Sequence, residues 1–139
     1  MSQIPYCTAL LVCDFVHRDP ATRKYSILGT FDRLYCHQNL EEPTPTGVFL
    51  SLANGHGKVH CDLSLVHSEN YKSSEKPLFN FEFEVAFENP LQPVEVGLNL
   101  KVAYQQTGVF YWQVWAGEGE NRQLLLEKPL HVSTPPENP

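Results

Sequence analysis

The sequence predicts an all-β fold, an antiparallel β-sandwich of about eight strands. Apolar and polar residues alternate with a period of two in residues 59–65, 78–87 and 94–102, as in strands with one buried face. Turn-forming Gly, Pro, Asn and Asp residues separate these segments. No segment keeps the 3.6-residue period of an amphipathic helix. Short strands without helices favour two packed sheets, with a closed barrel as the alternative.

Eight segments are expected to form the strands. They cover residues 6–16, 24–34, 47–52, 59–65, 78–87, 94–102, 109–116 and 123–132. The first is apolar on both faces, as in a strand covered twice, and it forms a hairpin with the second. The last contains Pro129, which a sheet tolerates at an edge or a bulge. Residues 121–128 are the best helical candidate, but three consecutive leucines do not make an amphipathic stripe.

The length of 139 residues fits one domain. We expect this domain to span residues 1–132. Residues 133–139 contain three prolines and are expected to form a flexible, Pro-rich tail.

Composition excludes several classes of protein. Ten Lys and Arg against sixteen Asp and Glu give a formal charge of −6, without a basic run that could neutralise a phosphate backbone, so no nucleic-acid partner is expected. The apolar residues 9–16 are interrupted by Asp14 and are too short for a membrane helix, and they do not form a signal peptide. We therefore expect no membrane partner and a cytoplasmic location, with reduced cysteines.

Two tryptophans, Trp112 and Trp115, lie late in the chain, after all four cysteines. A true immunoglobulin domain has a buried Trp between two bridged cysteines, and this signature is missing. The expectation is thus a generic immunoglobulin-like or fibronectin-like sandwich, a fold that carries many unrelated functions.

Residues 13–32 begin with Cys-Asp-Phe-Val-His-Arg-Asp-Pro and continue to Gly29-Thr30-Phe31-Asp32. This stretch resembles the opening hairpin of a family of small uncharacterised bacterial proteins, and residues 108–110 and 126–132 resemble its later half. The resemblance implies an immunoglobulin-like sandwich and implies no activity. Arg23 stands where the family pattern has Gly, so a positive φ at this position would cost about 1 kcal/mol.

Four residues could be combined into a metal site, namely Cys36, His37, His56 and His60. Their spacing matches no zinc motif, and His60 and Cys61 are neighbours that point to opposite faces of a strand. Structural cysteines and surface histidines are the better interpretation. We find no nucleophile elbow, phosphate loop or other catalytic motif, so we expect no enzyme and no cofactor.

The candidate binding residues are Tyr111, Gln113 and Trp115. If Phe110 and Trp112 face the core, alternation places these three on the outer face of a strand. A partner protein or second copy, a stacked sugar, or a segment of the same chain could cover them. Our hypothesis is a non-enzymatic interaction or accessory module, alone or as a homodimer, with a carbohydrate-type ligand as the alternative. Glu82 and Glu84 indicate an acidic outer face, which serves for solvation or attracts a basic partner.

Overall fold

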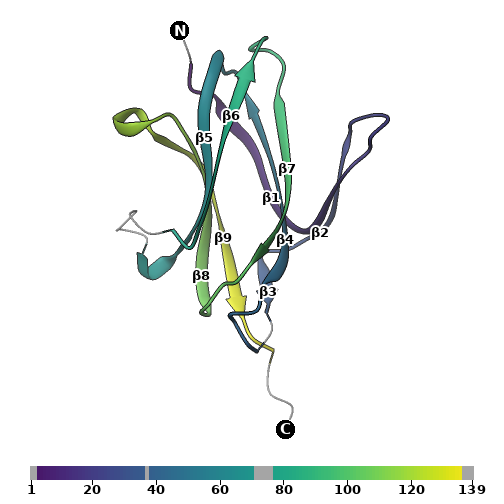
Figure 1. Cartoon of the computed structure of the whole chain (residues 1–139), viewed down its shortest axis with the longest axis vertical. Coiled ribbons are helices and arrows are strands. Elements are labelled where there is room, and N and C mark those ends of the chain that lie inside the picture. Colours follow the sequence, from purple (N-terminus) through teal and green to yellow (C-terminus); the bar gives the residue numbers. More distant parts are fainter. Residues whose placement is uncertain (1–2, 37, 71–76, 136–139) are drawn as a thin grey trace.

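A computed structural model describes residues 3–36, 38–70 and 77–135 and confirms the all-β class. Nine strands are arranged in two sheets that face each other (Figure 1). The described residues contain no α-helix, only the 3₁₀ turns Ser68–Asn70 and Gly119–Asn121. The strands are β1 (Tyr6–Arg18), β2 (Tyr25–Thr30), β3 (Arg33–Tyr35), β4 (Thr44–Ala53), β5 (Gly57–His67), β6 (Phe79–Phe87), β7 (Val94–Val102), β8 (Gly108–Ala116) and β9 (Gln123–Ser133).

One sheet has the strand order β2-β1-β4-β7 and the other β3-β9-β8-β5-β6. All pairs are antiparallel, as predicted, except β3 with β9, which is parallel and forms one edge of the five-stranded sheet. The predicted strand 24–34 is wrong. It divides into β2 and β3 because the chain passes from one sheet to the other at residues 31 and 32. The N–H of Phe31 still donates to the Val12 carbonyl of β1, whereas the carbonyl of Asp32 accepts the N–H of His131 on β9. The immunoglobulin-like topology stays a prediction.

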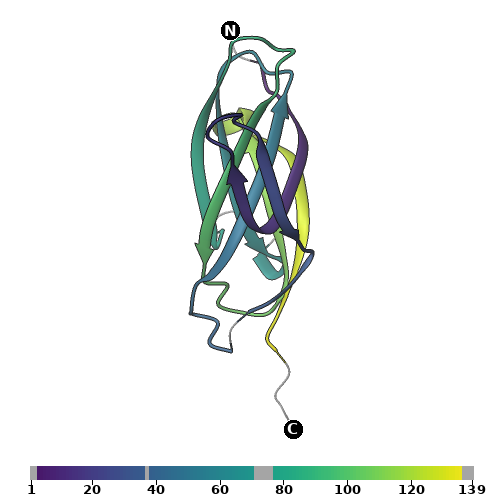
Figure 2. The ribbon, with the colours of Figure 1, turned by 90° about the vertical axis from the view of Figure 1, so that its right-hand side faces the viewer.

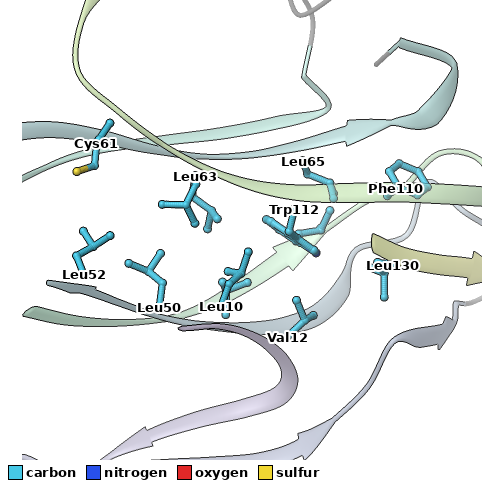
Figure 3. Packing of buried hydrophobic residues seen from close by; sticks show 14 of the residues in the cluster. Leu10, Val12, Leu50, Leu52, Cys61, Leu63, Leu65, Phe110, Trp112 and Leu130 are labelled. Atoms are coloured by element: carbon cyan, nitrogen blue, oxygen red, sulfur yellow. The ribbon is translucent and has the colours of Figure 1, made fainter. Parts of the chain in front are cut away.

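The core lies between the two sheets, and Figure 3 shows its central side chains. Alternation predicted the inner faces of β5 and β8, and both are confirmed, with Leu63, Leu65, Phe110 and Trp112 fully buried. The Nε1–H of Trp112 finds no hydrogen-bond partner there. The edge strands are less covered, since the Phe81 side chain remains 36% exposed. The sandwich is therefore tightly closed along its middle and more open at the β6 edge.

The first hairpin forms a flap, defined here as residues 14–30, that crosses the outer face of the four-stranded sheet (Figure 2). Val16 and Tyr25 pack with Phe49 in a second, smaller cluster, in which the Tyr25 and Phe49 rings meet edge to face. Gly97 lies beneath them, and a Cβ there would stand 2.6 Å from Tyr25 and 2.7 Å from Val16. The amide of Asn99 donates to the Val16 carbonyl at 2.8 Å and accepts from its N–H at 2.9 Å. The flap explains why β1 is apolar on both faces.

The flap turn confirms the expected backbone strain. Asp19 accepts the N–H groups of Ala21 and Thr22 through Oδ1, which forms an Asx turn. Arg23 has a φ of 64°, the left-handed conformation that favours glycine. An arginine occupies this position although a glycine would adopt it without strain.

Strand β9 runs to Ser133, one residue beyond the expected domain boundary. The predicted tail is described only as far as Pro135, and residues 136–139 lie outside the described part. No helix in the described ranges is long and apolar enough to cross a membrane.

Candidate functional site

Strand β8 presents the three predicted binding residues on the outer face of the five-stranded sheet. Its inner face consists of Phe110, Trp112, Val114 and Ala116, all fully buried. Tyr111 and Trp115 are partly buried on the outer side, whereas Gln113 is only 6% exposed. The orientation is therefore as predicted, but Gln113 is not an open surface group.

Neighbouring side chains hold Trp115 in place. Its Nε1–H donates to Oε1 of Gln113 at 3.1 Å, and Nε2 of Gln113 donates to Glu127 on β9 at 3.1 Å. The guanidinium carbon of Arg122, from the β8–β9 connection, lies 3.9 Å from the centroid of the Trp115 ring. Local cover by the same chain was one of the three expected arrangements, and Arg122 supplies it for one side of the ring. We call Tyr111, Gln113, Trp115 and Arg122 the platform.

Arg122 also binds a buried carboxylate on the neighbouring strand. Its Nε and Nη2 donate to the two oxygens of Asp62 at 3.0 and 2.8 Å, a bidentate ion pair. Asp62 is directly opposite Trp115 in the β5–β8 register and is 3% exposed. Ser64 and Asn80 each donate a further hydrogen bond of 3.0 Å to Oδ2 of Asp62. The network locks the conformation of Arg122 and thereby the cover of Trp115.

The pKa of Asp62 results from opposing effects. Burial by itself raises the pKa, because a charged carboxylate loses hydration. The hydrogen bonds and positive charge of Arg122, with the hydrogen bonds from Ser64 and Asn80, outweigh burial and lower it. Asp62 is therefore ionised at neutral pH and its charge is balanced by Arg122.

An acidic rim surrounds one end of the platform. Glu82 and Glu84 on β6 are exposed, as the sequence predicted, and Glu118 joins them from the β8–β9 connection. His60 lies between two of these carboxylates, with its ring nitrogens 3.7 Å from Glu82 and 3.7 Å from Glu118. Asp62, also at an outward-facing position of β5, is instead buried and paired with Arg122.

A hollow of about 130 Å³ adjoins the platform. Ser64, Gln113, Trp115, Arg122 and Leu124 contribute to its wall. Its volume is below the range of roughly 300–1,000 Å³ typical of small-ligand sites. The polar groups of Trp115 and Gln113 already bond each other and Glu127. This arrangement offers few free groups to a sugar.

A larger hollow of about 320 Å³ separates the flap turn from the β6–β7 connection. Arg18 and Arg23 line its flap side, and Glu88 and Glu95 line the opposite side. The two positive charges on the flap side balance the two negative charges on the opposite side. The hollow therefore favours neither anions nor cations.

The proposed metal ligands are not brought together. Within residues 3–36, 38–70 and 77–135, no three His, Cys, Asp or Glu side chains form a group that could hold a metal ion. Cys36 lies near the start of β8, since its N–H bonds Ser133, whereas His60 lies near the end of β8, where its carbonyl accepts the N–H of Gly117. His37 lies outside the described residues.

The four thiols are free, and burial raises the pKa of each. For Cys61 burial is the largest cause, the charge of Asp62 adds to it, and the pKa rises to about 12. A protonated thiol is a poor nucleophile and a poor metal ligand. The cysteines therefore act as small apolar side chains, as expected for Cys61 from its strand face.

The sequence predicts which face of β8 carries Trp115, but it does not predict that Asp62 and Arg122 hold this side chain in place. Alternation could have placed Asp62 and Ser64 opposite Trp115 and Gln113, because all four belong to outward-facing positions of β5 and β8. Arg122 lies in a connection whose path no periodicity reveals. The fold and this site define a β-sandwich with a rigid aromatic and charged platform on one outer face.

The chain matches no protein-family model, and no curated protein is significantly similar to it. The resemblance of residues 13–32 to small bacterial proteins therefore stays a prediction.

Proposed function

We propose that this chain is a non-enzymatic interaction module that binds another protein through the platform. The carrying observation is Arg122, which covers Trp115 at 3.9 Å while it binds Asp62 through two hydrogen bonds. Trp, Tyr and Arg dominate the binding energy of protein interfaces. Here Arg122 contacts Trp115, and Tyr111 lies on the same outer face of β8.

The rigidity of the platform supports this function. Side chains that are free in solution lose about 0.5–1.5 kcal/mol each when an interface immobilises them. Trp115, Gln113 and Arg122 are already held by hydrogen bonds and stacking. A partner would therefore bind them at a lower entropic cost.

The acidic rim indicates the kind of partner. Glu82, Glu84 and Glu118 lie at one end of the platform, and Arg122 is neutralised by Asp62. A homodimer that brought the two acidic rims together through this face would be unfavourable. A basic protein surface with an apolar centre is complementary, so we favour a different partner over a second copy.

The cysteines support a reducing compartment such as the cytoplasm, because all four are free in this fold. The raised thiol pKa values also support a function without nucleophilic catalysis. A carbohydrate ligand is the alternative, with less support because the hollow is small and the polar groups are already paired.

The test compares Trp115→Ala with Tyr6→Ala, an exposed aromatic at the start of β1 that serves as the control. The partner is first isolated with untagged protein from its own cells, and its affinity for each purified variant is then measured by calorimetry. We expect at least a tenfold loss for Trp115→Ala and no change for Tyr6→Ala. Equal affinities, with both variants folded by circular dichroism, would exclude the platform as the interface. Saturable quenching of tryptophan fluorescence by sugars would favour the alternative.

A further inference from the structure

The edges of the two sheets differ in how well they are protected. Free edges can pair with strands of other chains unless something blocks them. On β9 the N–H of His131 points away from β8 and bonds Asp32. Since N–H groups two residues apart point the same way, residue 129 would present its N–H at this edge, but it is a proline. Pro129 therefore removes one backbone donor from the part of β9 that β3 leaves unpaired.

The other sheet is also protected. Strand β2 has six residues, and Gly29 within it has a φ of 71°, which interrupts the regular strand. Strand β7 carries the flap on its outer face, where Asn99 bonds Val16. The β2 edge is therefore short and interrupted, and the flap lies over the outer face of β7 beside the other edge.

Strand β6 lacks such protection. It has nine residues without Pro or Gly, and its register with β5 is continuous from Gly57 opposite Phe87 to Leu65 opposite Phe79. No described strand pairs with its other side. Phe81 is 36% exposed, and its ring stacks on Phe83 at a centroid distance of 5.9 Å. This edge therefore combines free backbone groups with accessible apolar side chains.

The charges on β6 favour a basic partner strand over a second copy of this chain. Two copies could pair antiparallel through β6 about a two-fold axis at residues 82–84. Glu82 and Glu84 would then each face a glutamate or an uncharged residue of the other copy, because β6 contains no basic residue. Like charges directly opposite each other destabilise a sheet, and the whole chain carries a formal charge of −6. Lys or Arg opposite Glu82 and Glu84 would stabilise it instead.

We propose that the free edge of β6 accepts an added strand from a partner whose sequence alternates basic and apolar residues. The basic side chains lie beside Glu82 and Glu84 on the outer face, and the apolar ones cover Phe81 and Phe83. Backbone hydrogen bonds to β6 provide the affinity, and the alternating side chains provide the specificity. This surface shares Glu82 and Glu84 with the acidic rim but does not include Trp115, so the Trp115→Ala result does not decide the inference.

The probe is a capped nine-residue peptide of alternating Lys and Val. Two comparison peptides are a Glu–Val version and the Lys–Val peptide with alternate amides N-methylated on the edge that would face β6. Calorimetry should give at least tenfold tighter binding for the Lys–Val peptide than for either comparison. Hydrogen exchange should show added protection in residues 79–87.

The double variant E82K/E84K should reverse the preference, so that the Glu–Val peptide binds at least tenfold more tightly than the Lys–Val peptide. The control D32K/E41K makes the same change in net charge at exposed residues away from β6 and should keep the original preference. Both variants change exposed side chains only, and their melting curves check the fold. Equal effects of the two variants, unchanged binding of the N-methylated peptide, or protection outside residues 79–87 would overturn the proposal.

Discussion

Replacing Arg122 with Met tests whether the ion pair with Asp62 holds the platform together. The Met side chain keeps apolar contact with Trp115 but removes the charge and both hydrogen bonds to Asp62. Breaking a buried pair by removing one partner costs about 3–5 kcal/mol. Arg122 is one-third exposed, and Asp62 keeps its bonds from Ser64 and Asn80, so the cost falls at or just below the lower end of this range. We expect a loss of about 2–3 kcal/mol.

The loss is measured by urea unfolding followed by tryptophan fluorescence. For a domain of this size we expect the melting temperature to fall by about 8–12 °C. Arg33→Met is the matched control, because Arg33 is exposed and the described residues form no ion pair with it. The control should change the free energy of unfolding by less than about 0.5 kcal/mol.

A double-mutant cycle with Asp62→Asn separates the charge interaction from loss of packing. Removing both charges leaves no buried ion without a partner, so the double variant should be more stable than the sum of the two single losses predicts, by at least about 1 kcal/mol. If Arg122→Met costs less than about 1 kcal/mol, or if the two changes are additive, the ion pair does not organise this face.

Three further predictions concern the flap and the pH dependence. Gly97→Ala should destabilise the protein by about 1–3 kcal/mol and speed tryptic cleavage in the flap turn, because the new Cβ displaces Tyr25; unchanged cleavage and stability would contradict the packing. Arg23→Gly should raise the free energy of unfolding by up to about 1 kcal/mol, since relief of left-handed strain exceeds the added entropy of the unfolded chain; a loss in urea unfolding would show that the Arg23 side chain supports the turn. The pKa of Asp62 is lower in the folded than in the unfolded state, so its contribution is complete above about pH 5 and is lost as the pH falls through the folded-state pKa. Unfolding measured from pH 7 to pH 2 should therefore show a smaller acid loss for Asp62→Asn, and an identical pH profile would refute this.

The fold could be predicted in strands whose own alternation of apolar and polar residues shows which face is buried. Alternation in β5, β6 and β8 follows directly from burial of one face, so the all-β class and the inner faces were correct. Gly97 and Asn99 alternate with apolar residues in β7, a pattern typical of solvent-facing positions, yet the flap covers Gly97 and bonds Asn99. Contacts between segments more than 70 residues apart leave no local periodic signal.

The candidate site could likewise be predicted only in part. Tyr111, Gln113 and Trp115 were placed on the correct face, because a strand has only two. The exposure of Trp115 depends on Arg122, which folds back from the β8–β9 connection. Propensity and pattern describe such a connection only as polar and turn-forming. The residue that decides what a partner can touch was therefore the one that the sequence could not identify.

The two outer faces of the sandwich are covered by different means, and this difference favours the platform as the contact surface. The flap closes part of the four-stranded sheet with apolar packing around Phe49, which would have to be broken to admit a partner there. On the five-stranded sheet, the cover that the described residues provide consists of side chains such as Arg122, which leave Trp115 and Tyr111 partly exposed. A partner can bind that face without unfolding any strand. Loosening the flap with Gly97→Ala should therefore leave binding through Trp115 intact, whereas Arg122→Met should weaken it.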